Sequence, residues 1–569
     1  MEGAKQAEKL LQKLLADGLN GKGSYPDTVT YTNAINAWAQ SGDREAGNKA
    51  ESLLRQCSQV QTELGVTPNY MMYSAVINAW SKSRHPAAAK RVTALLQAME
   101  DAYAQGDASV CPSVVTYASV IDAWARSGGR EAPQQAERLL ENMKDLSAAG
   151  RADLAPNAIV YSTVINVWSK STDRKAPDRA MSLLEEAITR KVENTVCYNA
   201  VLAAFARHGD SSRALSLLND MKRCRPVQGS SVEPNTVSYS TVLNALGKSP
   251  NGGKEAADKA ERILCEVENE HRNGNAQVRP NTILYTNAIT AMANGRSTES
   301  AIEAENILWR LDSSSNTKDD SKKVDRSIPQ PDESKHPVLD ASLLSAVINC
   351  WFGSRDDESP ERISYLLEWG RKRNLFDGKD HQYRICINYH LGSLAKSKRP
   401  DAPTTIKDMI RNMENTDALP NPDVHSYNHL LSAVAPPNVS HPVLARFRIL
   451  RLLLDSKNKD VNTVQPNIRT FHLVLGACKN WANGNGQESL EDVSGVLRQM
   501  SGLVRNTDGW SPNAMTYQLF FEACQGLDSS DQKIPDEIYQ HYRANNRKRP
   551  SDSVERAYKA LSLRESYTG

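Results

Sequence analysis

The sequence lacks any run of about 18 apolar residues, so it offers no candidate transmembrane helix. Its nine cysteines form no C-x-x-C pair, and an odd number scattered through a long chain indicates reduced thiols rather than a disulfide framework or a zinc site. Positive and negative side chains are nearly balanced, with 69 Lys and Arg against 67 Asp and Glu and a net charge of +2. That balance excludes a chain that binds nucleic acid or membrane simply by being basic overall.

Signatures of common catalytic and metal sites are absent as well. The 11 histidines occur in neither an H-x-E nor an H-E-x-x-H pattern, and the sequence contains no P-C-x-x-C motif. It also contains no P-loop and no dinucleotide-binding glycine motif. The first 15 residues are amphipathic and include acidic side chains, which is typical of neither a signal peptide nor a transit peptide. We therefore expect a non-enzyme with no catalytic residue, no metal and no cofactor.

What the sequence does have is an internal repeat of about 40 residues. TVTYTNAINAWAQSG (28–42), VVTYASVIDAWARSG (114–128) and IVYSTVINVWSKS (159–171) share a Tyr and, two helical turns later, a Trp. The residues at the Tyr position define twelve copies, numbered 1 to 12 in chain order: Tyr31, Tyr73, Tyr117, Tyr161, Tyr198, Tyr239, Tyr285, Leu344, Tyr383, Tyr427, Phe471 and Tyr517. The length of the chain therefore reflects a number of repeats rather than a number of globular domains.

Each copy predicts two helices, which we name helix A and helix B. Helix A carries the Tyr, and helix B carries an A-x-x-L-L pattern at helical spacing, as in 50–54, 136–140 and 180–184. A Pro-Asn or Pro-Asp pair precedes many of the copies, where Pro ends one helix and the next residue can cap the following one. One such pair of helices cannot bury its apolar face alone, so neighbouring copies must stack. We expect an all-α fold, a right-handed α-solenoid of about twelve helix-turn-helix repeats.

Five segments are expected along the chain. Residues 1–25 form a partial repeat that holds only a helix B, and residues 26–311 hold seven well-formed repeats. Residues 312–337 are rich in Ser, Asp and Lys without apolar periodicity, so we expect a disordered insertion. Residues 338–535 hold degenerate repeats, and residues 536–569 a C-terminal helix and tail.

The Tyr of helix A, the A-x-x-L-L of helix B and the Pro-Asn junction together resemble the P-type pentatricopeptide repeat (PPR) family, with copies longer than the family's usual repeat. The tetratricopeptide repeat is excluded because its W-x-x-L-G-x-x-Y pattern is missing. The resemblance implies a monomeric protein that binds single-stranded RNA, one base per repeat, in a mitochondrion or plastid. It implies roles in RNA processing, stability or translation, with RNA-processing or translation proteins as further partners and no membrane attachment.

Numbering each copy from three residues before its Tyr places positions 2, 5, 9 and 13 on one face of helix A. Position 2 is apolar in copies 1 to 7, which suits packing on a base: Val29, Met71, Val115, Ile159, Val196, Val237 and Ile283. Position 13 is cationic in copies 2 to 6, which suits contact with phosphate: Lys82, Arg126, Lys170, Arg207 and Lys248.

The resemblance assigns base selection to position 5 together with the last residue of the same copy. The candidate pairs are Thr32 with Asn69, Ser74 with Ser113, Ala118 with Asn157, Ser162 with Asn194, Asn199 with Asn235, Ser240 with Asn281, Thr286 with Asp340, and Asn428 with Asn467. By the family's code the first seven pairs read A-N-N-A-Y-A-G from 5′ to 3′, and Asn428 with Asn467 suits a pyrimidine.

Other interpretations of these residues remain open. Each last residue can instead cap the next helix A, and capping and base contact can coexist. The Tyr, Trp and A-x-x-L-L residues are expected in the core. In copies 8 to 11 position 2 becomes Ser342, His381, His425 and Arg469, and position 13 loses its cation, so these copies are expected to extend the scaffold or hold a partner. The chain as a whole could also be a protein-binding scaffold or a binder of structured RNA such as tRNA or rRNA.

Overall fold

The computed structural model describes fifteen stretches of the chain. They are residues 2–19, 25–59, 66–224, 232–249, 253–316, 339–354, 356–397, 399–416, 418–434, 441–455, 464–485, 488–505, 512–527, 533–545 and 550–568. All regular secondary structure in these stretches is helical. The expected all-α helical-repeat fold is therefore confirmed, and the chain divides into two compact units, Met1–Gly252 with Lys259–Ala291, and Gly253–Asp258 with Met292–Gly569.

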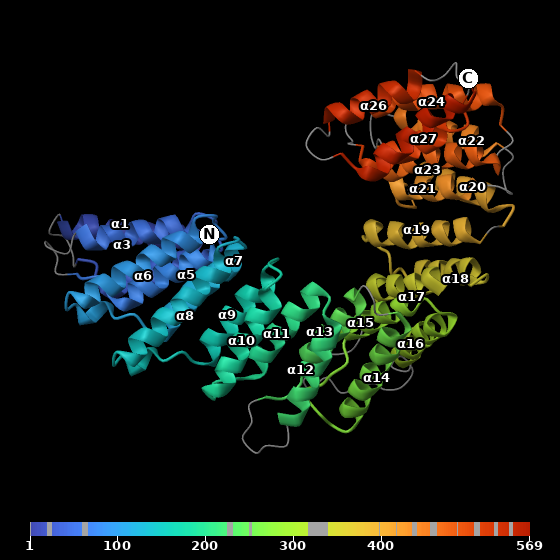
Figure 1. The fold of residues 1–569 in the computed structure, drawn as a ribbon. Helices are drawn as coiled ribbons and strands as arrows, with labels where there is room; N and C mark the ends of the chain where they lie inside the picture. The colour runs from blue at the N-terminus through green and yellow to red at the C-terminus, as the bar shows by residue number, and fades with distance from the viewer. Residues whose placement is uncertain are drawn as a thin grey trace. The chain divides into compact units, whose positions relative to one another are not determined.

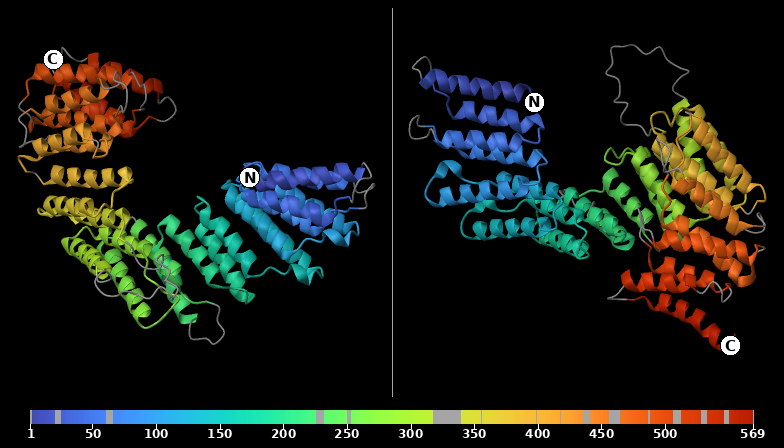
Figure 2. Two further views of the ribbon diagram at one scale, coloured as in Figure 1. Left: turned by 180° about the vertical axis from the view of Figure 1, so that it is seen from behind. Right: turned by 90° about the horizontal axis from the view of Figure 1, so that it is seen from above.

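Unit 1 alternates helices A and B. The helices A are α2 (Thr28–Ser41), α5 (Tyr70–Lys82), α7 (Val114–Ser127), α9 (Ala158–Lys170), α11 (Thr195–His208), α13 (Thr236–Lys248) and α15 (Thr282–Met292). The helices B are α1 (Glu2–Leu19), α3 (Ala46–Gln59), α6 (Ala88–Ala104), α8 (Ala132–Ala148), α10 (Ala176–Thr189), α12 (Ser211–Cys224) and most of α14 (Gly253–Arg272). Consecutive helices A from α2 to α13 pack on one another, and the views in Figures 1 and 2 show these helices stacked in chain order.

Unit 2 continues the same alternation. It begins with α16 (Thr298–Asn316), a helix B, and continues as α17 (Ala341–Ser354), α18 (Ser359–Lys372), α19 (Asp380–Lys396), α20 (Ala402–Asn415), α21 (Val424–Ala433), α22 (Pro442–Asp455), α23 (Ile468–Asn480), α24 (Leu490–Arg505), α25 (Ala514–Cys524), α26 (Lys533–Asn545) and α27 (Asp552–Thr568). Helix α16 reaches Asn316, so the segment expected to be an insertion from residue 312 is helical in its first five residues. Residues 317–338 lie outside the described residues. The C-terminal segment holds two helices rather than one.

In every helix A of the described residues except α19, the side chain of the residue before the helix caps the first turn, and in most copies that residue follows a Pro. The Asp27 carboxylate accepts from the backbone N–H of Thr30 at 2.8 Å, and the Asn69 amide oxygen accepts from that of Met72 at 3.1 Å. The same contact recurs at Ser113, Asn157, Asn194, Asn235, Asn281, Asp340, Asp423, Asn467 and Asn513. The capping role expected for these residues is confirmed.

The repeat signatures form the core. Ala50, Leu53 and Leu54 are buried, as are the equivalent residues of the other A-x-x-L-L segments. Tyr31 and Trp38 are at most 2% exposed, and the Tyr and Trp of copies 3 and 4 are buried in the same way. The interpretation as core is confirmed for these residues, whereas Tyr73 and Tyr427 are only half-buried.

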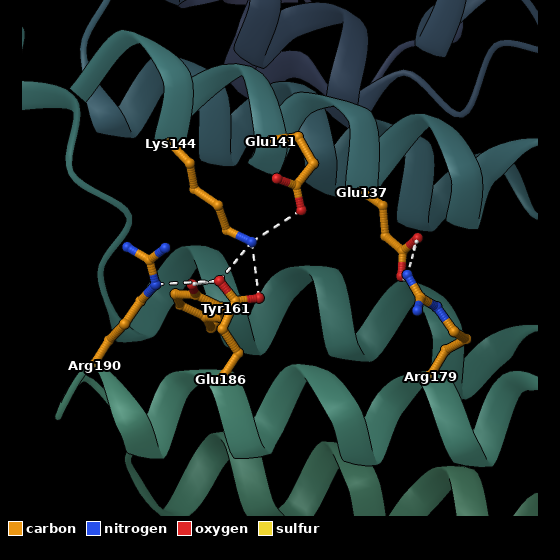
Figure 3. A network of polar contacts seen from close by, with 7 residues as sticks. All are labelled: Glu137, Glu141, Lys144, Tyr161, Arg179, Glu186 and Arg190. Atoms are coloured by element: carbon orange, nitrogen blue, oxygen red, sulfur yellow. Dashed lines mark hydrogen bonds and ion pairs between the residues drawn. The ribbon is translucent and has the colours of Figure 1, made fainter. Parts of the chain in front are cut away.

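Half-buried carboxylates connect consecutive repeats. The Tyr161 hydroxyl of α9 donates to Glu186 of α10 at 2.9 Å, and Lys144 of the preceding helix B pairs with the same carboxylate at 2.6 Å (Figure 3). Burial, followed by the bond to Glu186, raises the pKa of Tyr161 above its usual range. Tyr239, Glu266 and Lys222 repeat the arrangement two copies later. The Tyr is therefore a core residue with a polar tip that joins three helices.

A second set of carboxylates binds the Trp residues. Trp80 of α5 donates to Glu51 of α3 at 3.0 Å, and Arg91 of α6 donates to the same carboxylate. Trp351, Glu305 and Arg362 form the same group in unit 2. Because each group contains residues from two copies, it fixes how one repeat stacks on the next.

Candidate nucleic-acid interface

A row of exposed apolar side chains marks the helix A face of unit 1. All seven position-2 residues are between 50 and 71% exposed, although each is large and apolar: Val29, Met71, Val115, Ile159, Val196, Val237 and Ile283. Isolated exposed apolar residues need no explanation, but one per helix at the same position of seven consecutive helices does. These residues are available to pack against an apolar surface such as a nucleobase.

Next to this row lie polar pairs that join neighbouring helices A. The Asn199 amide of α11 donates to the side-chain oxygen of Asn235 at 3.3 Å, and Ser238 of α13 donates to the Asn199 oxygen at 2.6 Å. Asn235 caps α13, so the residue at position 5 and the last residue of the copy meet in space although they are far apart in sequence. We call such a pair a dyad. Ser74, Thr116 and Ser113 form a related chain of hydroxyl contacts between α5 and α7.

The caps keep polar groups available for a ligand. In Asn69, Asn157, Asn194, Asn235 and Asn281 the side-chain oxygen is used by the cap, whereas within the described residues the amide N–H groups donate no hydrogen bond. Such N–H groups can donate to an acceptor on the edge of a base. Capping and base contact are therefore compatible in one residue.

Three position-5 hydroxyls are turned to their own helix. Thr32 donates to the carbonyl of Thr28 at 2.7 Å, Ser162 to that of Ile159 at 2.9 Å, and Thr286 to that of Thr282 at 2.8 Å. Thr32 and Ser162 are also only 7 and 8% exposed. In this conformation the hydroxyl hydrogens are used within the helix, so these residues can accept a hydrogen bond from a base but cannot donate one.

The remaining pairs differ in their surroundings. Ser240 accepts at 3.0 Å from the Asn287 amide of the next helix A, and Ala118 has no polar atom in its side chain. Thr286 belongs to unit 1 and Asp340 to unit 2. In unit 2 the Asn428 amide donates to the Asn467 oxygen at 3.3 Å, which reproduces the Asn199–Asn235 dyad.

The five position-13 cations end their helices and are all exposed. Arg126 pairs with Asp122 of its own helix at 2.7 Å, and Arg207 donates to the carbonyl of Ser169 at 2.9 Å. Lys82, Lys170 and Lys248 have no hydrogen bond or ion pair within the described residues. A cation in the last turn is favoured by the helix dipole, so an exposed positive charge at these positions does not destabilise the helix.

Copy 9 contains a dyad that its sequence numbering does not predict. The residue that takes the buried Tyr position in this copy lies one helical turn after Tyr383. Asn388 donates to the Asp423 carboxylate at 3.1 Å and accepts from Ser426 at 2.7 Å, in the geometry of Asn199, Asn235 and Ser238. The buried anchor is accordingly Ile387, while Tyr383 stacks on Phe376 with ring centroids 4.3 Å apart.

This later register changes the other positions of copy 9. Position 2 becomes Ile385 in place of His381, and position 13 becomes Lys396, which donates to the carbonyl of Phe352 as Arg207 does to that of Ser169. The expectation that position 13 lacks a cation after copy 7 is therefore wrong for copy 9. The C-x-N triplet that Cys386–Asn388 shares with Cys197–Asn199 is the signal that could have located this register.

Within the described stretches, no three His, Cys, Asp or Glu residues are grouped so as to hold a metal ion. None of the helices in those stretches is both long and apolar enough to cross a membrane. The described cysteines are free thiols, mostly buried.

The stacked two-helix repeats, their capped junctions and the regular exposed face define an α-helical repeat protein. The model of the PPR repeat family matches residues 193–248, which hold the whole of α11, α12 and α13. Over these residues the chain is similar to the PPR repeat family.

Comparisons with known proteins give a consistent but distant picture. No curated protein matches this chain. The crystal structure of the pentatricopeptide repeat protein PPR10 from maize is similar at 17% identity, with a TM-score of 0.38, over 98% of this chain and 79% of that one. The structure of PPR10 in complex with an 18-nt psaJ RNA element is similar at 18% identity, with a TM-score of 0.41, over 100% and 90% of the two chains.

Proposed function

We propose that this protein binds single-stranded RNA along the helix A faces of its repeats, with selection of bases at the dyads. The observation that carries the proposal is the exposed apolar row of unit 1, because seven apolar side chains at one repeat position are at least 50% exposed. Along helix A the apolar row at position 2 is followed by the dyad residue at position 5 and, in copies 2 to 6, by a cation at position 13. These three kinds of contact suit the base faces, base edges and phosphates of an extended RNA.

The dyads define what the RNA sequence should be. In Asn199–Asn235 and in Asn428–Asn467 two side-chain amides lie in contact, and such a pair suits the edge of a pyrimidine. Asn388–Asp423 has the same form, and we expect a pyrimidine there as well. The element A-N-N-A-Y-A-G read by copies 1 to 7 is then followed by pyrimidines at the nucleotides of copies 9 and 10.

Binding of this kind acts by covering a segment of the RNA. A protein bound along a transcript can block exonucleases, keep a hairpin open or recruit a processing or translation protein, and it needs no catalytic residue for any of these. We place this activity in a mitochondrion or plastid, where family resemblance locates it.

Selection from a random pool of single-stranded RNA tests the proposal. Enrichment of A-N-N-A-Y-A-G with pyrimidines after it supports it, whereas enrichment of an unrelated motif contradicts base selection by these dyads. Absence of RNA binding even at low salt favours a protein-binding scaffold. Crosslinking in cells followed by sequencing of the attached RNA identifies target and compartment together.

A further inference from the structure

The third residue of helix A is a fully buried hydroxyl in several copies. It is Ser238 in α13 and Ser426 in α21, both 0% exposed, and Thr116, Thr470 and Thr516 in α7, α23 and α25, which are at most 1% exposed. A hydroxyl that is removed from water must find its hydrogen-bond partners within the protein. The partners of the two serines connect each of them to the copy before.

The hydrogen bonds of Ser238 have a defined direction. Its oxygen accepts from the backbone N–H of the cap residue Asn235 at 3.1 Å, which leaves its single hydrogen to be donated. The side-chain oxygen of Asn199, in the preceding helix A, lies at 2.6 Å, whereas that of Asn235 lies farther away at 3.2 Å. The hydroxyl therefore donates to Asn199. The capping contact at the start of α13 thus turns the hydroxyl toward the position-5 residue of the copy before.

The same arrangement recurs in unit 2. Ser426 accepts from the backbone N–H of the cap residue Asp423 at 3.2 Å and donates to the side-chain oxygen of Asn388 at 2.7 Å. The Asn388 amide in turn donates to the Asp423 carboxylate at 3.1 Å. Two dyads in different compact units therefore share one geometry of three residues, with the serine always supplied by the following helix A.

The serine determines which end of the amide is held inside the protein. The oxygen and nitrogen of an amide have nearly the same shape, so packing alone would allow Asn199 either orientation. Because Ser238 donates to the oxygen, the oxygen is held at the buried hydroxyl. One N–H of Asn199 then donates to Asn235, and within the described residues its second N–H makes no hydrogen bond. A base at this dyad therefore meets a hydrogen-bond donor.

We propose that Ser238 and Ser426 are positioning residues for base selection by the copies that precede them. Each fixes the position-5 amide with its oxygen inward, so that the N–H is left for the base. The inference rests on the proposed function and adds a third residue to the dyads of Asn199 and Asn388. Selection of one base then depends on a buried residue of the next copy.

Copy 10 provides an internal contrast. Thr470 accepts from the backbone N–H of Asn467 at 3.1 Å and lies 3.2 Å from the Asn467 side-chain oxygen. The side-chain oxygen of Asn428 is buried and has no hydrogen-bond partner among the residues that the structure describes. No hydroxyl there fixes the orientation of the Asn428 amide. We therefore expect the base at copy 10 to be selected less strictly than the base at copy 9.

A double-mutant cycle between Ser238 and Asn199 tests the inference. The probe is the single-stranded RNA A-N-N-A-Y-A-G, made with one defined base at each N and with each of the four bases in turn at the fifth position. We expect Ser238→Ala to reduce the preference for a pyrimidine at that base about fivefold, the factor for one hydrogen bond between neutral groups. Added to Asn199→Ala, the same change should reduce the preference no further, because Ser238 acts through Asn199.

Thr470→Val is the matched control, because it removes the same capping contact from a helix A of unit 2 without a contact to a position-5 amide. It should leave the preference at the fifth base unaltered, and thermal unfolding checks that both variants fold. Ser426→Ala repeats the test at the base of copy 9, on an RNA extended at its 3′ end.

Three outcomes would contradict the account, at different levels. If Ser238→Ala weakens binding of all four RNAs equally and keeps the pyrimidine preference, the serine has only a structural role, and the inference is wrong while RNA binding stands. The same holds if Ser238→Ala and Asn199→Ala lower the preference additively. If the wild-type protein binds none of the four RNAs at 50 mM salt, the proposed function itself is wrong.

Discussion

The side-chain amide of Asn199 donates a hydrogen bond to the side-chain oxygen of Asn235 at 3.3 Å, across 36 residues of sequence. One residue lies in the second turn of a helix A, and the other caps the next helix A. The contact brings together the two positions to which the proposed function assigns the selection of one base. The Asn235 oxygen also caps α13, so one side chain serves both the helix and the contact between copies.

Removing the Asn199 side chain tests this dyad. We expect Asn199→Ala to weaken binding of RNA with a pyrimidine at the fifth base by about 1 to 3 kcal/mol and to relax selection at that base alone, since each lost base contact has about this value. Competition binding with the four bases at that position measures both effects. Asn219→Ala, an exposed change on the helix B of the same copy, should alter neither. Equal loss at all seven bases would contradict a local reading role.

If RNA binds this face as proposed, Asp122 should weaken its binding. Its carboxylate holds Arg126 at 2.7 Å, so the cation of copy 3 is partly neutralised. We expect Asp122→Asn to strengthen RNA binding about two- to fivefold at low salt, the range of an exposed ion pair, and to steepen the salt dependence. Asp145→Asn makes the same change in charge on the exposed surface of α8 and serves as the control. A similar gain in both variants would show that only net charge matters.

Glu51 ties copy 1 to copy 2 and should be required for stability rather than for binding. Its carboxylate accepts from Trp80 and Arg91, and the residue is 7% exposed. We expect Glu51→Gln to destabilise the stacking of α3 on α5 by about 1 to 2 kcal/mol, because a charged acceptor is lost from a buried site. Faster hydrogen exchange confined to these helices would report it, and Glu185→Gln, an exposed change on α10, should leave exchange unaltered.

Unit 2 should lose stability in mild acid. Burial lowers the pKa of both His390 and His429 to about 4, so each is neutral when folded and protonated in the unfolded chain below its ordinary value of 6.5. The stability that they contribute is present above pH 6.5 and is lost as the pH falls towards 4, at about 1.4 kcal/mol per pH unit for each histidine. Thermal unfolding at pH 7 and 4.5 measures this loss, which His390→Gln and His429→Gln should each reduce. His381→Gln, an exposed change on α19, should not.

Much of this molecule could be predicted from the sequence because its structure is local and repeated. Tyr31, Trp38 and Leu53 identify the core by helical spacing, and the Pro-Asn junctions identify the caps. Both signals act within one or two helical turns, where sequence distance and spatial distance agree.

The parts that could not be predicted depend on contacts between copies. Tyr383 occupies the expected place of an anchor, but α19 begins one turn early and buries Ile387 instead, so the dyad of Asn388 and Asp423 was missed. The carboxylate of Glu51 meets Trp80 across 29 residues, and no local pattern distinguishes it from an exposed helix B glutamate. The two hydroxyls of Thr32 and Ser162 were expected at bases, yet they bond to their own helices.

The five cations Lys82, Arg126, Lys170, Arg207 and Lys248 allow the most direct test of RNA binding by the helix A face. The measurement is the affinity for single-stranded A-N-N-A-Y-A-G RNA between 50 and 300 mM salt, in the wild-type protein and with all five changed to Gln. A matched control changes five exposed cations of helices B to Gln: Lys13, Lys90, Arg138, Arg223 and Arg262. Five phosphate contacts predict a slope of log affinity against log salt of about −3.5, which should approach zero in the first variant and persist in the control. Equal slopes in both variants would contradict RNA binding on this face.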